Sequence, residues 1–347
     1  MRWPIKVSIR LSILSITLTL LLGISALIVG INYFVLDSVL IAAADSSLSY
    51  ASGKVSAQMS SFFSSLNSSA STAFQMLSTD TIKPEYSDEF VRFLYSLIAD
   101  NLEVCAVYWA DIDGNSYGLN RVDNGKYYLE QSALRNRNGD DIERLFDAKG
   151  KLLSIRALSE LPFDGEDIRS RLWYKQAKQE KRQIWVVYKF LKGSQGGALG
   201  VTAAIPLYDF KGDLLGVFGT DMLIETISKY VDDIKITKNS VVFVVDSSGS
   251  LIAVHGMGKK LHEGKELPKI ESLNLLWLEK SFTIYQQNHK SPFVYSVGNK
   301  KYISSYEKII GIQTIHPWFV SIVTPVDDII APLREKDLIA DKATFFL

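Results

Sequence analysis

VVFVVDSSGSLIAV, at residues 241–254, places a run of β-branched and apolar residues before an Asp-Ser-Ser-Gly turn and a second apolar run after it. β-Branched residues favour strands, and a turn rich in Asp and Gly between two such runs is typical of an antiparallel hairpin. The same pattern recurs around residues 111–114, 145–150 and 209–212. These hairpins, together with the helical segments described below, predict an α+β fold of antiparallel sheets.

The composition excludes several kinds of protein. The chain has 347 residues, with 38 Lys+Arg against 38 Asp+Glu, and this zero net charge argues against a basic nucleic-acid-binding face. The single cysteine forms neither an intramolecular disulfide nor a thiolate metal cluster. The sequence contains no nucleophile, zinc-protease or phosphate-loop motif, and its four histidines have no helical ligand spacing. We therefore expect no catalytic residue, no metal, no cofactor and no nucleic-acid partner.

Residues 11–36 form the longest uncharged stretch and predict a transmembrane helix. A helix of this length measures about 39 Å, more than the ~30 Å hydrocarbon core of a bilayer. Three basic residues and no acidic one precede it, so residues 1–10 are expected to be a cytoplasmic stub and everything after residue 36 to lie outside. A cleaved signal peptide ending near residues 42–44 is the alternative, but the apolar run is about twice the usual length. We expect an uncleaved single span in the inner membrane.

The segment 37–83 predicts a long stalk helix. It contains no proline before residue 84 and carries an apolar stripe at steps of three and four residues. The stripe consists of Val55, Met59, Phe62, Leu66, Ala70, Ala73 and Leu77. It is expected either to pack along the rest of its own chain or to form the seam of a homodimer, and it could do both at different heights.

The remaining residues divide into two similar units. The first covers residues 84–221, a connecting helix follows at 222–236, and the second covers 237–325. Each unit ends on an antiparallel pair of predicted strands, which indicates a loose internal repeat. Residues 326–347 are expected to form an exit helix toward a second membrane span that the sequence does not contain.

A cluster of aromatic and charged residues in the first unit has the chemistry of a binding site. It consists of Arg171, Trp173, Tyr174, Tyr188 and Asp221. A guanidinium pairs with a carboxylate through two hydrogen bonds, indole and phenol groups donate directionally, and a carboxylate complements an ammonium group. Structural roles are the alternative: Trp173 as a core aromatic, Arg171 as a partner of nearby acids, and Asp221 as the cap of the following helix.

Five motifs in order carry a resemblance to a known family. They are YWADIDG at 108–114, RLWYKQA at 171–177, IPLYD at 205–209, GVFGTD at 216–221 and PWFVSIVTP at 317–325. With the anchor and the long helix, they resemble the double-Cache (dCache) extracytoplasmic sensor domains of bacterial transmembrane receptors. The resemblance implies a membrane-distal PAS-like module that binds a small molecule, a membrane-proximal PAS-like module that relays, and a homodimer.

The resemblance also implies roles for the clustered residues. In amino-acid sensors of this family, Arg171 and Trp173 would hold the ligand carboxylate, and Tyr174, Tyr188 and Asp221 would hold its amine. The family motif has a tyrosine shortly before the arginine, and residues 163–168 contain none. We predict extracytoplasmic sensing of an amino acid or a related amine or carboxylate, as in chemotaxis receptors, with a histidine kinase or nucleotide cyclase as the missing output. The alternatives are a non-binding relay, a protein-interaction module and, less well supported, a membrane-tethered hydrolase.

Overall fold

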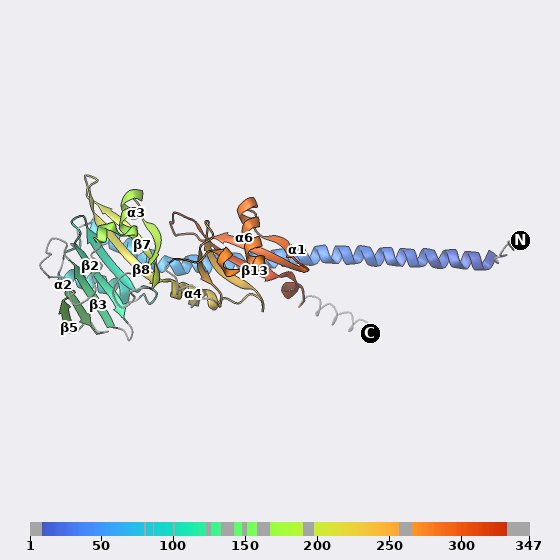
Figure 1. Ribbon diagram of the computed structural model, residues 1–347, viewed down its shortest axis with the longest axis horizontal. Coiled ribbons are helices and arrows are strands. Elements are labelled where there is room, and N and C mark those ends of the chain that lie inside the picture. The colour runs from blue at the N-terminus through green and yellow to red at the C-terminus, as the bar shows by residue number, and fades with distance from the viewer. Residues whose placement is uncertain are drawn as a thin grey trace.

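The computed structural model describes residues 9–79, 81–85, 87–99, 101–122, 126–132, 142–147, 151–157, 167–189, 198–256 and 266–331. One long helix, α1 (Ile9–Ser78), extends from the N-terminal end of the molecule, and two β-sheets lie against its C-terminal half (Figure 1). We call the unit farther from the N-terminus the distal module and the other the proximal module.

Helix α1 joins the predicted span and the predicted stalk into one helix of 70 residues. Its window Leu14–Ile31 is long and apolar enough to cross a membrane, and none of that window is buried inside the structure. Among the residues whose burial the structure describes, the first buried one after this window is Ala44, where the helix meets the proximal module. The apolar N-terminal part therefore projects from the folded modules as a bare helix (Figure 1).

The apolar stripe of α1 packs against the chain's own sheets. Val55, Met59 and Leu66 belong to the same buried cluster as residues of both sheets. At one position the prediction is wrong: Phe63 is fully buried, whereas Phe62 is only half-buried. Because both sheets cover this stripe, it is not free to be a dimer seam between residues 55 and 77.

The distal module contains α2 (Asp88–Ala99) and an eight-stranded antiparallel sheet of order β5-β4-β3-β2-β1-β8-β7-β6. The strands are β1 (Ala106–Asp111), β2 (Ser116–Val122), β3 (Lys126–Ser132), β4 (Ile142–Phe146), β5 (Leu152–Ala157), β6 (Ile184–Lys189), β7 (Leu199–Tyr208) and β8 (Leu214–Leu223). Before β6 the chain forms a 3-10 turn, η3 (Ile168–Ser170), and α3 (Leu172–Glu180). Helix α4 (Ile224–Asp232) then leads out of this module and begins two residues later than predicted, because β8 continues through Leu223.

The proximal module repeats part of this arrangement in a five-stranded antiparallel sheet of order β10-β9-β13-β12-β11. Its elements are β9 (Val241–Asp246), β10 (Leu251–Val254), η4 (Ile270–Leu273), α6 (Leu276–Asn288), β11 (Phe293–Val297), β12 (Lys300–Lys308) and β13 (Trp318–Pro325). Residues 326–331 are helical, and the rest of the predicted exit helix, residues 332–347, lies outside the described residues.

The four predicted hairpins are present as antiparallel strand pairs, although residues 148–150 of one turn lie outside the described residues. The pairs β1–β2, β4–β5, β7–β8 and β9–β10 are antiparallel. In three of these turns the carboxylate of Asp111, Asp209 or Asp246 accepts the backbone N–H groups two and four residues later, at 2.8 to 2.9 Å. Local side-chain to backbone bonding of this kind explains why the turns were predictable from sequence.

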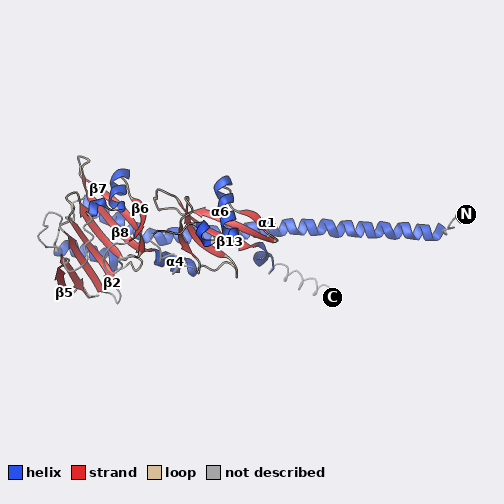
Figure 2. Cartoon of the chain, in the orientation of Figure 1, coloured by secondary structure: helices blue, strands red, loops and turns tan. Residues whose placement is uncertain are grey.

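Each sheet lies between α1 and a second helix (Figure 2). In β1, Val107 and Trp109 join the cluster that contains α1, whereas Ala110 and Tyr108 pack in the cluster that contains α3. This two-residue alternation is the normal geometry of a strand. It fixes which side chains of β1, β6, β7 and β8 face α3, and those side chains build the candidate site.

Candidate ligand site in the distal module

The face of the distal sheet beneath α3 carries a buried carboxylate surrounded by hydroxyl groups. Asp221, near the end of β8, lies opposite Thr202 of β7 and Ala106 of β1 in the strand register. Its Oδ1 accepts hydrogen bonds from the Thr202 hydroxyl at 2.5 Å and from the Tyr108 hydroxyl at 2.7 Å. Its Oδ2 accepts a longer bond of 3.4 Å from the Tyr188 hydroxyl of β6. Three strands thus converge on one carboxylate.

Burial dominates the electrostatics of this carboxylate. It raises the pKa of Asp221 to about 7, although the hydrogen bonds from Thr202, Tyr108 and Tyr188 and the charge of Arg171 act in the opposite direction. Burial and the neighbouring carboxylate also raise the pKa values of Tyr108 and Tyr188, so both phenols stay protonated and can donate. A carboxylate in this state gains free energy from any additional cation or donor that reaches it.

Helix α3 covers the site with an indole. Trp173, in the first turn of α3, is completely buried, and its ring centroid lies 4.9 Å from that of Tyr108. The Trp173 Nε1 has no hydrogen-bond partner within the described part of the chain. A buried indole N–H normally has a hydrogen-bond partner, and the indoles of Trp109 and Trp185 likewise have none among the described residues.

Arg171 immediately precedes α3, at its N-cap position. Its charge lowers the pKa values of both Asp221 and Tyr188, which shows that the guanidinium lies within electrostatic reach of the site. The alternative partner Asp167 already binds the Nε and Nη2 atoms of Arg169, at 3.0 and 2.6 Å. The site therefore combines a buried carboxylate with a guanidinium that lies within electrostatic reach of it.

Tyr174 lies in the adjacent part of α3 but faces elsewhere. Its hydroxyl donates to the backbone carbonyl of Asp111 at 3.2 Å, and burial raises its pKa to about 12. The structure thus brings Trp173, Tyr188 and Asp221 together with Arg171 nearby, and it ties the Tyr174 hydroxyl to the β1–β2 turn. In this arrangement Tyr174 anchors the covering helix to the sheet.

Asp221 does not cap the following helix. The N-cap of α4 is Leu223, and the N-terminus of that helix has no side-chain cap. The carboxylate instead points to the face of the sheet that α3 covers, where it meets Thr202 and Tyr108. The capping alternative is therefore wrong, and this buried acid needs another explanation.

Two members of the hydroxyl group were not among the predicted site residues, namely Tyr108 and Thr202. Gly219 makes the position of Tyr108 possible, because a Cβ atom at residue 219 would lie 2.2 Å from the Tyr108 ring. The glycine and the tyrosine are opposite each other in the register of β1 and β8. The signal in the sequence was the two-residue alternation through YWAD, which puts Tyr108 on the same face as Ala110.

Comparison with known proteins agrees with this architecture. Residues 36–333 match the family model described as Cache domain, of the double-Cache type. The chain therefore belongs to the Cache domain family.

Solved structures with the same fold are sensor domains of receptors. The ligand-binding domain of the Pseudomonas aeruginosa PAO1 amino-acid chemoreceptor PctC, in complex with GABA, superposes with a TM-score of 0.50 and 16% identity, covering 81% of this chain and 99% of that chain. The corresponding domain of the Pseudomonas fluorescens chemoreceptor CtaA with L-leucine gives 0.51 and 15%, covering 84% and 99%. The extracellular domain of the putative histidine kinase mmHK1S-Z3 gives 0.51 and 16%, covering 83% and 94%. At these identities the likeness shows the fold alone.

A curated relative is longer than this chain. Adenylate cyclase 1 of Rhizobium meliloti (strain 1021) is 22% identical over 340 residues, which cover 92% of this chain and 50% of that protein. The chain thus spans about half the length of the curated relative.

Proposed function

We propose that this Cache domain senses a small molecule with an ammonium group, such as an amino acid or a related amine, in the distal module. The buried Asp221 carboxylate carries the proposal. Burying a carboxylate is costly, and a ligand ammonium at Oδ2 would offset that cost where the described residues offer only the long bond from Tyr188. The aromatic rings of Trp173 and Tyr108 beside it favour a cation.

The other end of such a ligand would meet Arg171 and Trp173. A guanidinium binds a carboxylate through parallel hydrogen bonds, and the Trp173 N–H is a free donor within the described residues. Solved Cache sensor domains of this fold hold GABA or L-leucine, which carry both groups. These observations support an amino acid ahead of a simple amine. Tyr174 takes part by holding α3 in place.

The proposal extends to the organisation of the receptor. The distal module, residues 84–221, binds the ligand; the proximal module, residues 237–325, relays; and α1 anchors both in the inner membrane with the modules outside. The relation to an adenylate cyclase of twice the length supports a cytoplasmic output domain, of the nucleotide cyclase or histidine kinase kind, in the complete receptor.

Ligand binding to the whole chain in lipid nanodiscs tests this function. Thermal unfolding is recorded with L-amino acids, with GABA, with simple amines and with carboxylates, for the wild type and for Asp221→Asn and Arg171→Ala. A ligand at ~100 times its dissociation constant adds about 2.7 kcal/mol to the stability, or several degrees in the midpoint. The matched control is Asp209→Asn, which alters a turn of the same sheet remote from the site.

The expected result is that one class containing an ammonium group raises the midpoint, that Asp221→Asn abolishes the shift and that Asp209→Asn retains it. Because the ammonium pairs with ionised Asp221, its affinity should also rise between pH 6 and pH 8. If no compound moves the midpoint, the domain is a relay or a protein-interaction module. If the shift survives in Asp221→Asn, the assignment of the site is wrong.

A further inference from the structure

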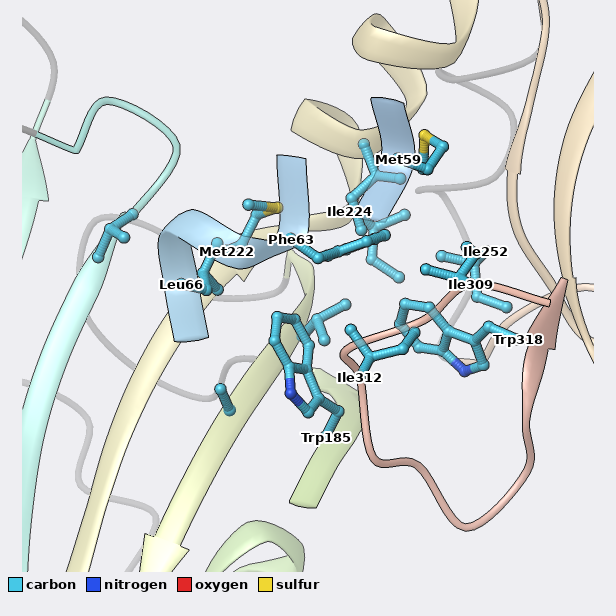
Figure 3. Close-up of a cluster of buried hydrophobic side chains, with 14 of the residues drawn as sticks. Met59, Phe63, Leu66, Trp185, Met222, Ile224, Ile252, Ile309, Ile312 and Trp318 are labelled. Carbon is cyan, nitrogen blue, oxygen red and sulfur yellow. The ribbon is translucent and has the colours of Figure 1, made fainter. Parts of the chain in front are cut away.

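The two modules meet on α1 at a junction built from three elements. These are the C-terminal third of α1 around Phe63 and Asn67, the segment 182–185 at the start of β6, and the loop 309–317 that joins β12 to β13. Figure 3 shows the apolar part of this junction, where Phe63 faces both Trp185 of the distal module and Trp318 of the proximal module.

The aromatic contacts of the junction are specific in geometry. The ring of Phe63 meets Trp185 edge-on at 5.4 Å and 89°, and it meets Trp318 at 5.8 Å and 70°. All three side chains are almost completely buried, and Ile309 and Ile312 of the loop belong to the same cluster. Because protein interiors are close-packed, a shift of the Trp185 side chain displaces the side chains that contact it.

Hydrogen bonds tie the same three elements together. The Trp185 backbone N–H donates to the carbonyl of Gln313 at 2.7 Å, and Arg182 Nη1 donates to the Gln313 side chain at 2.8 Å. Asn67 of α1 accepts from Gln183 Nε2 at 2.9 Å and donates through Nδ2 to the carbonyl of Gly311 at 2.5 Å. A single side chain of α1 is thus bonded to both modules.

Strand β6 connects this junction to the candidate site. It begins beside the junction, and three residues after Trp185 the hydroxyl of Tyr188 bonds Asp221 at 3.4 Å and lies 3.5 Å from that of Tyr108. β6 is the edge strand of its sheet, with β7 as its only neighbour in the sheet. On its other side the described residues give one bridge, from Trp185 to Thr314 of the loop 309–317, so β6 has fewer ladder bonds than a central strand and its outer edge is tied to that loop.

On the side away from α1 the modules are separated by a cleft of about 530 Å³. Its walls include Leu172 and Gln176 of α3, Val187 of β6, and Leu267, Ile315 and His316 of the proximal module. The modules are therefore joined tightly next to α1 and open on the side of α3. This asymmetry would allow a pivot near Phe63.

We propose that β6 couples the Asp221 site to α1 and to the proximal module by pivoting at the Phe63–Trp185–Trp318 junction. A change at the Asp221 carboxylate alters its bond to Tyr188 and shifts β6 along β7. The loop 309–317 and α1 follow, because both are bonded to residues 182–185. The inference deepens the proposed function by naming its route of transmission, and it requires no knowledge of the ligand.

Hydrogen exchange on the whole chain in nanodiscs tests the coupling with a substitution in place of a ligand. Asp221→Asn changes the charge of the site, and exchange is followed in peptides covering residues 59–67, 182–189 and 309–317. We expect a several-fold change in all three segments. Asp209→Asn, the remote acid of the same sheet, should leave them unchanged. In Tyr188→Phe, which keeps the ring, a further Asp221→Asn substitution should no longer alter segment 309–317.

The reverse direction provides an independent measurement, since coupling between two sites is reciprocal. Asn67→Ala should alter exchange in β6 and β8 around Tyr188 and Asp221, whereas Gln58→Ala on the exposed face of α1 should not. Thermal unfolding of each variant confirms that it is folded. The coupling is refuted if Asp221→Asn changes exchange within the distal sheet while residues 309–317 and 59–67 stay as in the wild type. A failure of every ligand to bind would refute the proposed function and leave this result unaffected.

Discussion

The distal and proximal modules share a strand order and differ in the side chains that cover the sheet. Strands β2-β1-β8-β7-β6 of the distal sheet and β10-β9-β13-β12-β11 of the proximal sheet have the same order and direction. In each module a helix precedes the edge strand in the chain, α3 before β6 and α6 before β11. The register shows which positions of the two modules are equivalent. Tyr108 lies opposite Gly219 in the distal sheet, and at the equivalent positions of the proximal sheet Phe243 lies opposite Ser321. Likewise Thr202 lies opposite Asp221, and Ser304 lies opposite Val323.

Among the described residues, the proximal core cluster beneath α6 consists of apolar side chains and is rich in aromatic rings. Tyr306 stacks on Tyr285 with centroids 4.2 Å apart, and its hydroxyl lies 2.9 Å from Ser281, which also bonds Ser304 at 2.8 Å. By register, the distal counterpart of Tyr306 is Ala204. The same strand order thus holds either a core filled with stacked rings or, in the distal module, a buried carboxylate surrounded by hydroxyl groups.

The largest predicted effect concerns the filled core. Tyr306→Ala should lower the free energy of unfolding by about 3–5 kcal/mol, because it removes a buried ring and leaves a cavity. Thermal unfolding measures this loss, and Tyr50→Ala, at a tyrosine that is 77% exposed, is the control. If the two variants are equally stable, the proximal interior is not the packed core described above.

The pH dependence of stability should reveal the buried carboxyl group that the distal interior contains. The pKa of Asp221 is about 7 in the folded state and ~3.9 in an unfolded chain. Between these values the folded state holds a proton that the unfolded chain has lost. The free energy of unfolding therefore falls as the pH rises from about 4 to 7, by up to about 4 kcal/mol.

Comparing the wild type with Asp221→Asn isolates this contribution, since the amide does not titrate. The stability of the variant relative to the wild type should increase with pH across that window and be constant above it. A difference that is the same at pH 5 and pH 7.5 would mean that Asp221 is ionised throughout and is already neutralised by the protein.

Exchanging the residues opposite Tyr108 and Phe243 tests the comparison position by position. Gly219→Ser should cost about 1–3 kcal/mol and displace Tyr108 from Asp221, because the new Cβ would overlap the tyrosine ring. Ser321→Gly, at the equivalent position, should cost less, since nothing there depends on a missing side chain. Thermal unfolding and the ligand shift of each variant give the two readouts, and equal costs would contradict the assigned role of Gly219.

The smallest effect concerns what the modules share. Asp111→Ala and Asp246→Ala each remove a carboxylate that accepts two backbone N–H groups, and each should cost about 1 kcal/mol. Similar losses of stability in thermal unfolding would support the same role for the aspartate turn in both modules. A loss in only one of the two variants would mean that the two turns contribute differently to stability.

The features that sequence could predict depend on neighbours in the chain. The Asp-to-Gly turns form from residues within five positions of one another, and the stripe on α1 follows from helical spacing, with an error only at Phe62. The hydroxyl group around Asp221 is different, because Tyr108 is 113 positions away from it. Finding it requires knowing that β1 pairs with β8. The capping alternative failed for a similar reason, since β8 continues past Asp221.

The continuity of α1 gives the molecule a lever arm. Its 70 residues correspond to about 105 Å, and the junction at Phe63 lies about 48 Å from Ile31 along the axis. A rotation of one degree about that point displaces the membrane end of this arm by about 0.8 Å, and a few degrees give displacements of several ångströms. Small rearrangements around Asp221 can thus be amplified by the length of α1 alone. A break in the helix between Ile31 and Phe63 would uncouple its membrane end from the junction.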